Sequence, residues 1–458
     1  MLTGVKCLVF LTREQKMIIS RWFGCYRFIW NAKCEEEKYQ RSFAKRYLPI
    51  GTYPKVDQTF SQYKNKELSP WLFLVPSQLL RNSVTNWHKT YKNFLKGLCG
   101  KPICKRKTTY DSIHLTRELF SFEKCLDGNI RLFIGTKTNN IGYIVIKKHK
   151  KFKEPNSLYL KRHNGRFYIA FCYEDNLETI SQKDYLKNIQ DLSFQKLDEM
   201  VVGIDRGVIR PIQAGDDFFN FNDKQKRKKR AKEKYIKKCQ RKMNRQQKGS
   251  KKREKTKLKI SKSHEKIGNI RKDFCHKTTR SLVDKKEHQI FILEDLKTKN
   301  MTKKPKAKKD EKGKYIKNNR KQKAGLNRSI LDNGWNLFET FLKYKAVKAK
   351  KMWYKVLANH TSQECAECGH IHPQNRRSQT DFCCLSCGHI DNADRNAARV
   401  IKKRALKLLL YSGTELSSRG VLLDIERGAI NKTQRAKANC AKSNEALKKK
   451  EKASLVSA

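Results

Sequence analysis

Residues 199–207 read EMVVGIDRG, and residues 289–296 read QIFILEDL. Both are short apolar runs of the kind that forms buried strands, and both end at an acid, Asp205 in the first and Glu294 in the second. A third acid, Asp394, lies in the run DNADRNAARVI, whose Ala-rich part predicts a helix that begins at this acid. The chain therefore places three carboxylates at the ends of separate predicted elements.

These three acids suit divalent-metal chemistry. Carboxylate oxygens bind Mg²⁺, and two Mg²⁺ ions about 4 Å apart can activate water and stabilise the leaving oxygen in phosphodiester cleavage. The order strand, hairpin, basic helices, strand and acid-bearing helix predicts a ribonuclease-H-like α/β core. Asp205, Glu294 and Asp394 are its predicted catalytic residues and Mg²⁺ ligands.

Each acid also has a plainer explanation. An Asp after a strand commonly caps a turn, and a Glu can pair with a nearby lysine. Two neighbouring acids are rivals: Asp295 is expected to point to the opposite strand face from Glu294, and Asp391 to lie in the exit loop of the cysteine-rich segment. The joint pattern favours the first three.

Two Cys-x-x-Cys pairs precede Asp394, with 15 residues between the pairs. The spacing predicts a zinc ribbon over residues 361–391 that holds one structural Zn²⁺ through Cys365, Cys368, Cys384 and Cys387. Because four thiolates leave no open position for water, this metal is not expected to take part in catalysis.

The charge of the chain indicates nucleic-acid partners. Its 104 Lys and Arg residues against 44 Asp and Glu give a formal net charge of +60, which phosphates neutralise through counterion release. No run of 18 apolar residues and no lipid-anchor motif is present, so no membrane association is expected. The N-terminus lacks a secretory pattern, so we expect an intracellular protein, in a bacterial cytoplasm.

Hydrophobic periodicity predicts the organisation of the rest of the chain. Short apolar runs at 118–175, with a strand at 1–10, predict a small antiparallel barrel or sheet, of which we expect the barrel. Residues 11–117 predict an inserted helical region. Residues 176–198 are predicted to be a linker to the core at 199–360 and 392–424. Within and after that core we expect basic helices at 223–285, a mobile basic loop at 302–324 and a disordered tail at 425–458.

Several cations are candidate nucleic-acid contacts. Two lie in the finger of the ribbon, and three lie in the basic helical region: Arg376, Arg377, Lys226, Arg227 and Arg271.

Five blocks, in order, resemble those of the TnpB family of transposon-encoded RNA-guided nucleases, which are related to miniature type V CRISPR effectors and to Fanzor proteins. They are GIDRG, ILEDLKTKNM, HTSQECAECGH, FCCLSCGH and NADRNAARVI. The resemblance extends to about residue 420. It implies that Asp205, Glu294 and Asp394 are RuvC acids, and that CxxCG in both halves selects Cys384 over Cys383. It also implies that the barrel is a wedge domain and the helical region a recognition lobe.

The resemblance implies an RNA-guided DNA endonuclease. Such a protein holds a noncoding guide RNA, reads a short motif beside the target and cuts double-stranded DNA at one RuvC site. Two alternatives stay open at this stage: a DNA-strand transposase or resolvase that uses no RNA, and a catalytically silent guided binder. The sequence leaves open the guide, the motif and whether one or two copies assemble on one RNA. One residue departs from the resemblance: Arg206 of this chain occupies a place in the first block that is usually apolar in the TnpB family.

Overall fold

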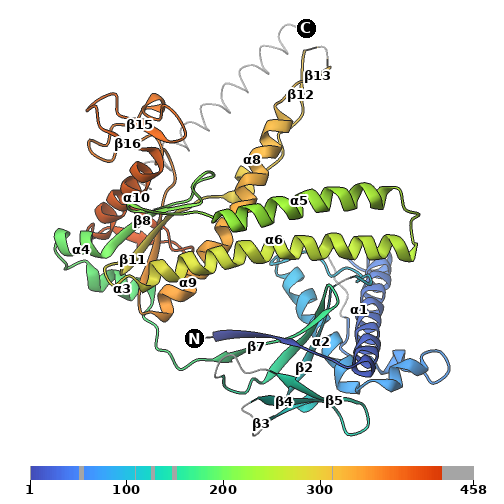
Figure 1. Cartoon of the computed structure of the whole chain (residues 1–458). Coiled ribbons are helices and arrows are strands. Elements are labelled where there is room, and N and C mark those ends of the chain that lie inside the picture. The colour runs from blue at the N-terminus through green and yellow to red at the C-terminus, as the bar shows by residue number, and fades with distance from the viewer. Residues whose placement is uncertain are drawn as a thin grey trace. The chain divides into compact units, whose positions relative to one another are not determined.

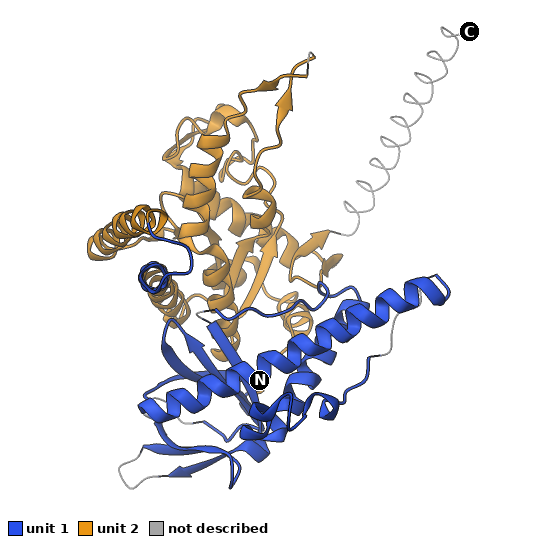
Figure 2. Ribbon diagram, turned by 90° about the vertical axis from the view of Figure 1, so that its right-hand side faces the viewer, with its two compact units in different colours: residues 1–177, 246–262 blue, residues 178–245, 263–458 orange. Residues whose placement is uncertain are grey.

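The computed structural model describes residues 2–50, 56–108, 110–124, 129–146, 152–311 and 313–424 (Figure 1). The chain divides into two compact units, Met1–Leu177 with Gln246–Lys262 and Glu178–Arg245 with Ser263–Ala458 (Figure 2). The predicted tail at 425–458 lies outside the described residues.

The first unit contains two antiparallel sheets. One has the order β1-β7-β6-β2, with β1 Leu2–Val9, β7 Arg166–Glu174, β6 Ser157–His163 and β2 Tyr110–Thr116. The other has the order β3-β4-β5, with β3 Phe120–Lys124, β4 Ile130–Gly135 and β5 Asn140–Ile146. Residues of both sheets share one apolar core. In the described residues the predicted barrel is therefore a pair of sheets rather than one closed sheet.

Strand β2 corrects the predicted boundary of the helical region at residue 117. Its burial alternates along the strand, with Asp111, Ile113 and Leu115 facing inward. This period of two is that of a half-buried strand. The sequence does not indicate this strand clearly, because the first of its inward-facing residues, Asp111, is an acid. Asp111 ion-pairs with Arg27 and Arg162 instead of facing solvent.

Two long helices from the region predicted to be helical, 11–117, contribute residues to this core. Helix α1, Arg13–Tyr47, begins at a capping box in which Thr12 and Gln15 bond each other's backbone amides. Helix α2, Ser77–Leu95, packs on α1, and the Ser83 hydroxyl donates to the Tyr26 carbonyl at 2.7 Å. Short 3₁₀ turns occur at Ser61–Tyr63, Pro70–Leu74 and Arg117–Leu119.

The second unit is built on a five-stranded mixed sheet of order β10-β9-β8-β11-β14 (Figure 1). Strand β9 Ile212–Ala214 is antiparallel to both of its neighbours, β10 Asp217–Phe219 and β8 Val201–Asp205. Strand β8, β11 Ile290–Glu294 and β14 Met352–Val356 are parallel. The two predicted acid-bearing strands are therefore adjacent at the centre of the sheet.

Helices cover both faces of this sheet. Apolar residues of α3 Gln182–Ile189, α4 Phe194–Met200 and α10 Ala393–Leu409 pack on one face. Those of α6 Lys251–Asp284 and α9 Trp335–Lys348 pack on the other. Helix α5, Asp223–Asn244, precedes α6. Among the described helices, none is both long enough and apolar enough to cross a membrane.

Two predicted irregular segments carry regular structure. The predicted linker at 176–198 contains α3 and α4, whose Leu186, Ile189 and Leu197 are buried in the core of the second unit. Polar residues on their outer faces hid this apolar stripe.

The predicted loop at 302–324 contains the short strands β12 Lys308–Lys309 and β13 Tyr315–Ile316, and α8 Arg320–Asn333 begins inside it. Its turn is closed by Asp310, whose side chain accepts from the Lys314 amide at 2.7 Å. The remaining elements are α7 Thr298–Met301, a 3₁₀ turn at Pro373–Asn375, β15 Asp381–Cys383, β16 Ile390–Asn392, β17 Thr414–Leu416 and β18 Leu422–Asp424.

Helix α10 and strand β8 approach each other closely at Gly203. A Cβ atom built on Gly203 would lie 2.1 Å from the Ala398 carbonyl oxygen and 2.7 Å from the Lys402 amide nitrogen. Both contacts are with backbone, which cannot move aside as a side chain can. Only glycine allows the helix to lie this near the strand.

We therefore expect Gly203→Ala to displace α10 and to lower the free energy of unfolding by about 2 kcal/mol, as for other overpacked cores. Thermal or urea unfolding measures it. Gly268→Ala is the matched control, because Gly268 lies in α6 with open space around its missing Cβ. That change should be neutral or slightly stabilising. Equal stability of the two variants would contradict the argument.

Candidate active site and zinc ribbon

Two of the three predicted acids end neighbouring parallel strands. In the register of β8 with β11, Ile204 pairs with Leu293, so Asp205 and Glu294 take the next position on each strand. The carboxyl ends of parallel strands meet at one edge of a sheet. The first two carboxylates are therefore neighbours because of strand pairing alone.

The third acid, Asp394, lies in the first turn of α10, where the positive end of the helix dipole favours a carboxylate. The side chain of Asn392 caps this helix and accepts from the Asp394 amide at 3.2 Å. Ala398 of α10 touches Gly203 of β8. Asp394 lies four residues before Ala398, which is about 6 Å along the helix. Asp205 lies two residues after Gly203, which is about 7 Å along the strand. The close contact thus brings the two carboxylates to the same edge.

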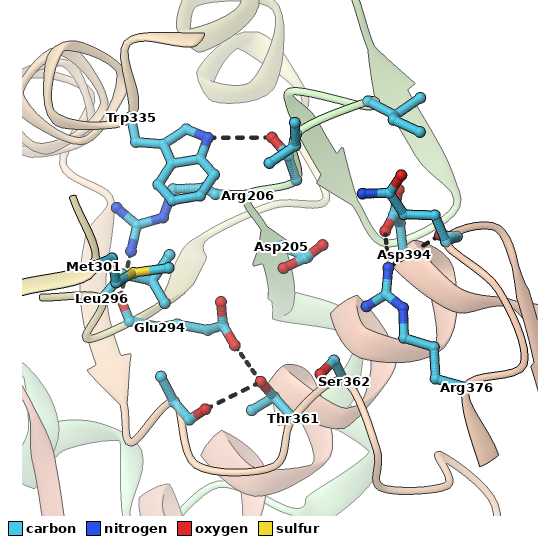
Figure 3. A pocket seen from close by; sticks show the side chains of 15 residues that line it. Asp205, Arg206, Glu294, Leu296, Met301, Trp335, Thr361, Ser362, Arg376 and Asp394 are labelled. Carbon is cyan, nitrogen blue, oxygen red and sulfur yellow. Dashed lines mark hydrogen bonds and ion pairs between the residues drawn. The ribbon is translucent and has the colours of Figure 1, made fainter. Parts of the chain in front are cut away.

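All three carboxylates line one cavity of about 370 Å³ in the second unit. Asp205 lies between Glu294 and Asp394 in this cavity (Figure 3). Convergence of the three acids, which the sequence predicted from element order, is thus a feature of the structure. Their catalytic role stays a prediction.

Burial of three acids in one cavity raises their pKa values. Loss of solvent raises the pKa of Asp205 well above its ordinary value, and the charges of Glu294 and Asp394 raise it further. Burial also raises the pKa values of Glu294 and Asp394. A divalent cation held among these oxygens would relieve both effects. The donor set, three carboxylates without sulfur or imidazole, fits Mg²⁺.

Two arginines face Asp394. The Nη2 atom of Arg376 lies 3.3 Å from Asp394 Oδ1, and Arg210 Nη1 donates to Asn392 Oδ1 at 3.1 Å. Both charges oppose the rise that burial causes in the pKa of Asp394. Arg376 was predicted only as a nucleic-acid contact of the ribbon finger. In the structure it lines the acidic cavity itself.

Thr361 contacts the second acid, and sequence reasoning missed it. Its hydroxyl donates to Glu294 Oε1, and both side chains are buried. The bond opposes the rise that burial causes in the pKa of Glu294, and it fixes the orientation of the carboxylate. Thr361 lies four residues before Cys365, which is the only sequence signal for it. Nothing in the sequence indicates that the segment before Cys365 meets the end of the strand that bears Glu294.

Arg206, at the place where the TnpB resemblance implies an apolar residue, is 3% exposed and ion-paired. Its Nη2 donates to the Glu294 carbonyl, and its Nη1 lies 2.9 Å from Glu339 Oε2. Lys343 and Lys355 each lie 2.8 Å from Glu339 Oε1. Burial acts to raise the pKa of Glu339, but hydrogen bonds from both lysines and the charge of Arg206 lower it to about 2. This network ties the ends of β8 and β11 to α9 and β14.

The rival acids are occupied elsewhere. Asp295 lies 3.4 Å from Lys355 Nζ and 3.3 Å from Arg419 Nη2. Asp391 is buried in β16, not in an exit loop as predicted, and it pairs with Arg399 at 3.4 Å. Neither lines the cavity.

One predicted nucleic-acid contact has a structural role. Arg271 Nη2 lies 2.6 Å from Asp332 Oδ1, and its Nε donates to the Asp332 carbonyl at 2.7 Å. These bonds join α6 to α8, so Arg271 has a structural role, and its contact with nucleic acid stays a prediction. Arg377 and Arg227 are exposed and Lys226 is half-buried, and their contacts stay predictions.

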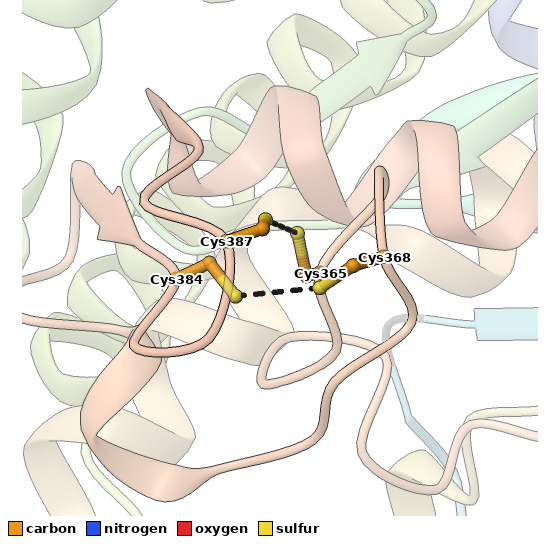
Figure 4. Close-up of side chains that lie close together, drawn as sticks. All are labelled: Cys365, Cys368, Cys384 and Cys387. Carbon is orange, nitrogen blue, oxygen red and sulfur yellow. Dashed lines mark hydrogen bonds between the residues drawn. The ribbon is translucent and has the colours of Figure 1, made fainter.

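The four predicted cysteines form one cluster (Figure 4). Their sulfur atoms lie within 4.8 Å of one another, with 3.7 Å between Cys365 and Cys387 and 3.6 Å between Cys368 and Cys384. A tetrahedral zinc ion with Zn–S bonds of about 2.3 Å separates its sulfur ligands by about 3.8 Å. The cluster therefore fits a closed four-thiolate zinc site.

The two halves of the cluster repeat one backbone turn. The amide of Gly369 donates to the Cys365 carbonyl at 3.0 Å, and that of Gly388 donates to the Cys384 carbonyl at 3.1 Å. Both glycines have positive φ, 76° and 71°, which favours glycine. Cys383 ends strand β15 and lies outside the cluster, so the selection of Cys384 matches the geometry.

The ribbon is fastened to α10 by a buried amide. The side chain of Asn396 accepts from the Ala366 amide at 2.9 Å and donates to the Glu364 carbonyl at 2.8 Å. The ribbon that carries Arg376 is thereby held against the helix that carries Asp394.

The purified chain is expected to contain one zinc ion, and Cys365→Ser should remove it and lower the thermal midpoint, because three thiolates bind zinc far more weakly than four. Cys383→Ser is the matched control and should keep the metal. Elemental analysis of both variants is the measurement. Zinc loss in the Cys383 variant with retention in the Cys365 variant would contradict the assignment.

Three family models match the chain in order. They are described as a helix-turn-helix domain at residues 1–41, a probable transposase (OrfB_IS605) at 189–304 and a Cas12f1-like TNB domain at 335–401. The first range contains β1 and most of α1 in the structure. The second covers Asp205 and Glu294, and the third covers the cysteine cluster and Asp394.

Relatives match over most of the length of the chain. "Putative RNA-guided DNA endonuclease InsQ" of Escherichia coli (strain K12) is 29% identical over 391 residues, which is 85% of this chain and 88% of that protein. A "Putative RNA-guided DNA endonuclease" of Streptomyces pristinaespiralis is 25% identical, over 85% of this chain and 86% of its own. A solved Cas12f1–sgRNA–target DNA complex aligns with a TM-score of 0.49 at 12% identity, over 88% of this chain and 98% of that one. Its matched models and its relatives over most of its length agree that the chain is similar to OrfB-type transposon proteins and to proteins named RNA-guided DNA endonucleases.

Proposed function

We propose that the chain is an RNA-guided endonuclease that cuts double-stranded DNA at one RuvC-like site in a ribonuclease-H-like core. The observation that carries the proposal is the convergence of Asp205, Glu294 and Asp394 from β8, β11 and α10 in one cavity. Two relatives that match most of the chain bear the name RNA-guided DNA endonuclease, which supports the same activity here.

The three carboxylates would hold two Mg²⁺ ions. When bound, the ions would activate water and stabilise the leaving oxygen of a phosphodiester. The chain's own residues orient the donors: Thr361 fixes the Glu294 carboxylate, and Asn392 fixes the first turn that carries Asp394. Arg376, beside Asp394, is placed to contact a phosphate oxygen once the acids are neutralised by metal.

The rest of the chain would hold the nucleic acids. Helix α5 exposes a series of lysines and arginines, including Arg227, and its basic surface suits the backbone of an RNA or of an RNA–DNA duplex. The two-sheet unit would be the wedge domain and α1 with α2 the recognition lobe. The ribbon would hold a structural zinc ion. Guide RNA and target DNA are thus the proposed partners.

The two alternatives are less well supported. A silent binder would have no need to keep three carboxylates in one cavity against their mutual repulsion. A transposase without RNA would not need the large positive charge of the chain. Copurification from cells that carry the native locus tests the transposase alternative, because one defined noncoding RNA with a variable end is expected only for a guided protein. Cleavage of plasmid DNA in Mg²⁺ tests the silent binder, which would hold the same RNA but would not cut.

Asp205→Asn should abolish cleavage of a matched plasmid by the copurified complex. Loss of even an indirect partner of a bound metal commonly costs ten- to a hundredfold, so we expect a loss of more than about a hundredfold for a direct ligand. The rate of plasmid linearisation in Mg²⁺ is the measurement. Asp216→Asn, at an acid whose side chain is 73% exposed, is the control and should cut normally. An active Asp205 variant would refute the site.

Thr361→Val should lower cleavage by about tenfold and raise the Mg²⁺ concentration needed for half-maximal rate, because the Glu294 carboxylate loses the hydroxyl that orients it. Thr361→Ser keeps a hydroxyl at the same place and should retain both values near those of the unchanged chain. A Val variant with normal Mg²⁺ dependence would show that the hydroxyl does not act on the metal site.

A further inference from the structure

The turn that follows β8 lies beside both the first and the third acid of the cavity. Asp205 ends β8, and Gly207 is the second residue after it. A Cβ atom built on Gly207 would lie 2.5 Å from the Arg210 carbonyl oxygen and 3.6 Å from Asp394 Oδ2. The backbone of the turn therefore closes tightly on itself and lies against the Asp394 carboxylate. Its conformation sets how far Asp205 lies from Asp394.

Side chains from two helices hold this turn by hydrogen bonds. Asn333, the last residue of α8, donates from Nδ2 to the carbonyls of Gly207 at 3.0 Å and Val208 at 2.9 Å. Trp335, the first residue of α9, donates from its indole to the Gly207 carbonyl at 3.2 Å. Asn333 and Trp335 are both buried, so little water is at hand to replace a lost donor. The conformation of the turn thus depends on α8 and α9 as well as on β8.

The amide of Asn333 acts on the turn and not on the helix that carries it. Asn333 does not line the cavity, so its side chain reaches the acids only through the turn. The end of α8 has attachments of its own, because the neighbouring Asp332 pairs with Lys229 of α5 and lies 2.6 Å from Arg271 Nη2 of α6. Removal of the Asn333 amide would therefore release the turn while the end of α8 stays in place.

We propose that Asn333 is a positioning residue of the nuclease site: by holding the carbonyls of Gly207 and Val208, it fixes the separation of the Asp205 and Asp394 carboxylates. Asp205 lies between the other two acids (Figure 3), so this separation decides whether oxygens of both Asp205 and Asp394 can reach one divalent cation. The inference rests on the proposed nuclease function and names a residue outside the cavity on which its metal site depends.

The test compares Asn333→Leu with the unchanged chain, each purified in full length with its native RNA. Leucine has a similar branched shape but donates no hydrogen bond. The rate of cutting at saturating matched DNA should fall by about ten- to a hundredfold, the range for groups that orient a metal ligand. The DNA concentration that gives half of this rate should stay the same, because Asn333 lies outside the cavity that would receive the DNA.

A second measurement does not depend on cutting. Binding of Mn²⁺ is followed in the absence of DNA through the electron paramagnetic resonance signal of the free ion. The binding that Asp205→Asn lacks is the share of the acidic cavity, since the subtraction removes Mn²⁺ held by RNA phosphates. Asn333→Leu should weaken this share by about tenfold or more. If the unchanged chain binds Mn²⁺ in this way but cuts no matched target, the nuclease proposal fails, while the role of Asn333 at the metal site is still measured.

Asn327→Leu is the matched control. Asn327 lies in the same helix, and its side-chain amide donates to the Thr302 carbonyl at 2.9 Å instead of to the turn. It loses the same kind of hydrogen bond as Asn333→Leu does. All variants are compared at a temperature at which thermal unfolding shows them folded. The control should cut and bind Mn²⁺ as the unchanged chain does.

Two results would overturn the inference. One is normal Mn²⁺ binding by folded Asn333→Leu. The other is an equal loss in Asn333→Leu and Asn327→Leu, which would indicate a general effect of loosening α8. If Asn333→Leu does not fold, Trp335→Phe tests the same turn, because it removes one donor to Gly207 and keeps an aromatic ring. That variant should weaken Mn²⁺ binding by about two- to fivefold, as for one hydrogen bond, and no change in it would equally refute the proposal.

Discussion

The close contact between α10 and β8 at Gly203 is the constraint on which the site depends. Strand pairing alone brings Asp205 beside Glu294, since their strands are adjacent and in register. The third acid comes from a helix that the chain reaches only after the ribbon. Its position is set by how near α10 can lie to the sheet, and the missing Cβ of Gly203 sets that distance.

Packing three carboxylates into one cavity has an energetic cost in the absence of metal. The raised pKa of Asp205 means that its charged form is less stable in the folded chain than in the unfolded one. This loss applies above the ordinary pKa of an Asp, hence at neutral pH. The buried network around Arg206 and Glu339 acts in the opposite sense, because the lowered pKa of Glu339 reports a favourable charge in the folded state. The edge of the sheet that bears the acids is thus braced by opposite charges directly behind it.

The sequence predicted those features that depend on local pattern. Apolar runs located β8 and β11, the repeated CxxCG located the cysteine cluster, and an Ala-rich run located α10. It failed where a side chain is assigned by tertiary contact. Thr361 and Arg376 are separated in sequence from the acids they bond, and Arg271 looks like any other cation of a basic helix until Asp332 is found beside it. The sequence predicts a linker at 176–198, where α3 and α4 occur, because only one narrow stripe on each helix is apolar.

The zinc ribbon influences the candidate site through position rather than through metal chemistry. Its four cysteines close one end of the finger, and Asn396 binds its first turn to α10. Arg376, which the finger carries, then meets Asp394, which α10 carries. The fold of the ribbon therefore sets where Arg376 meets the acid. The four cysteines thus bear on the charge balance of a cavity that none of them lines.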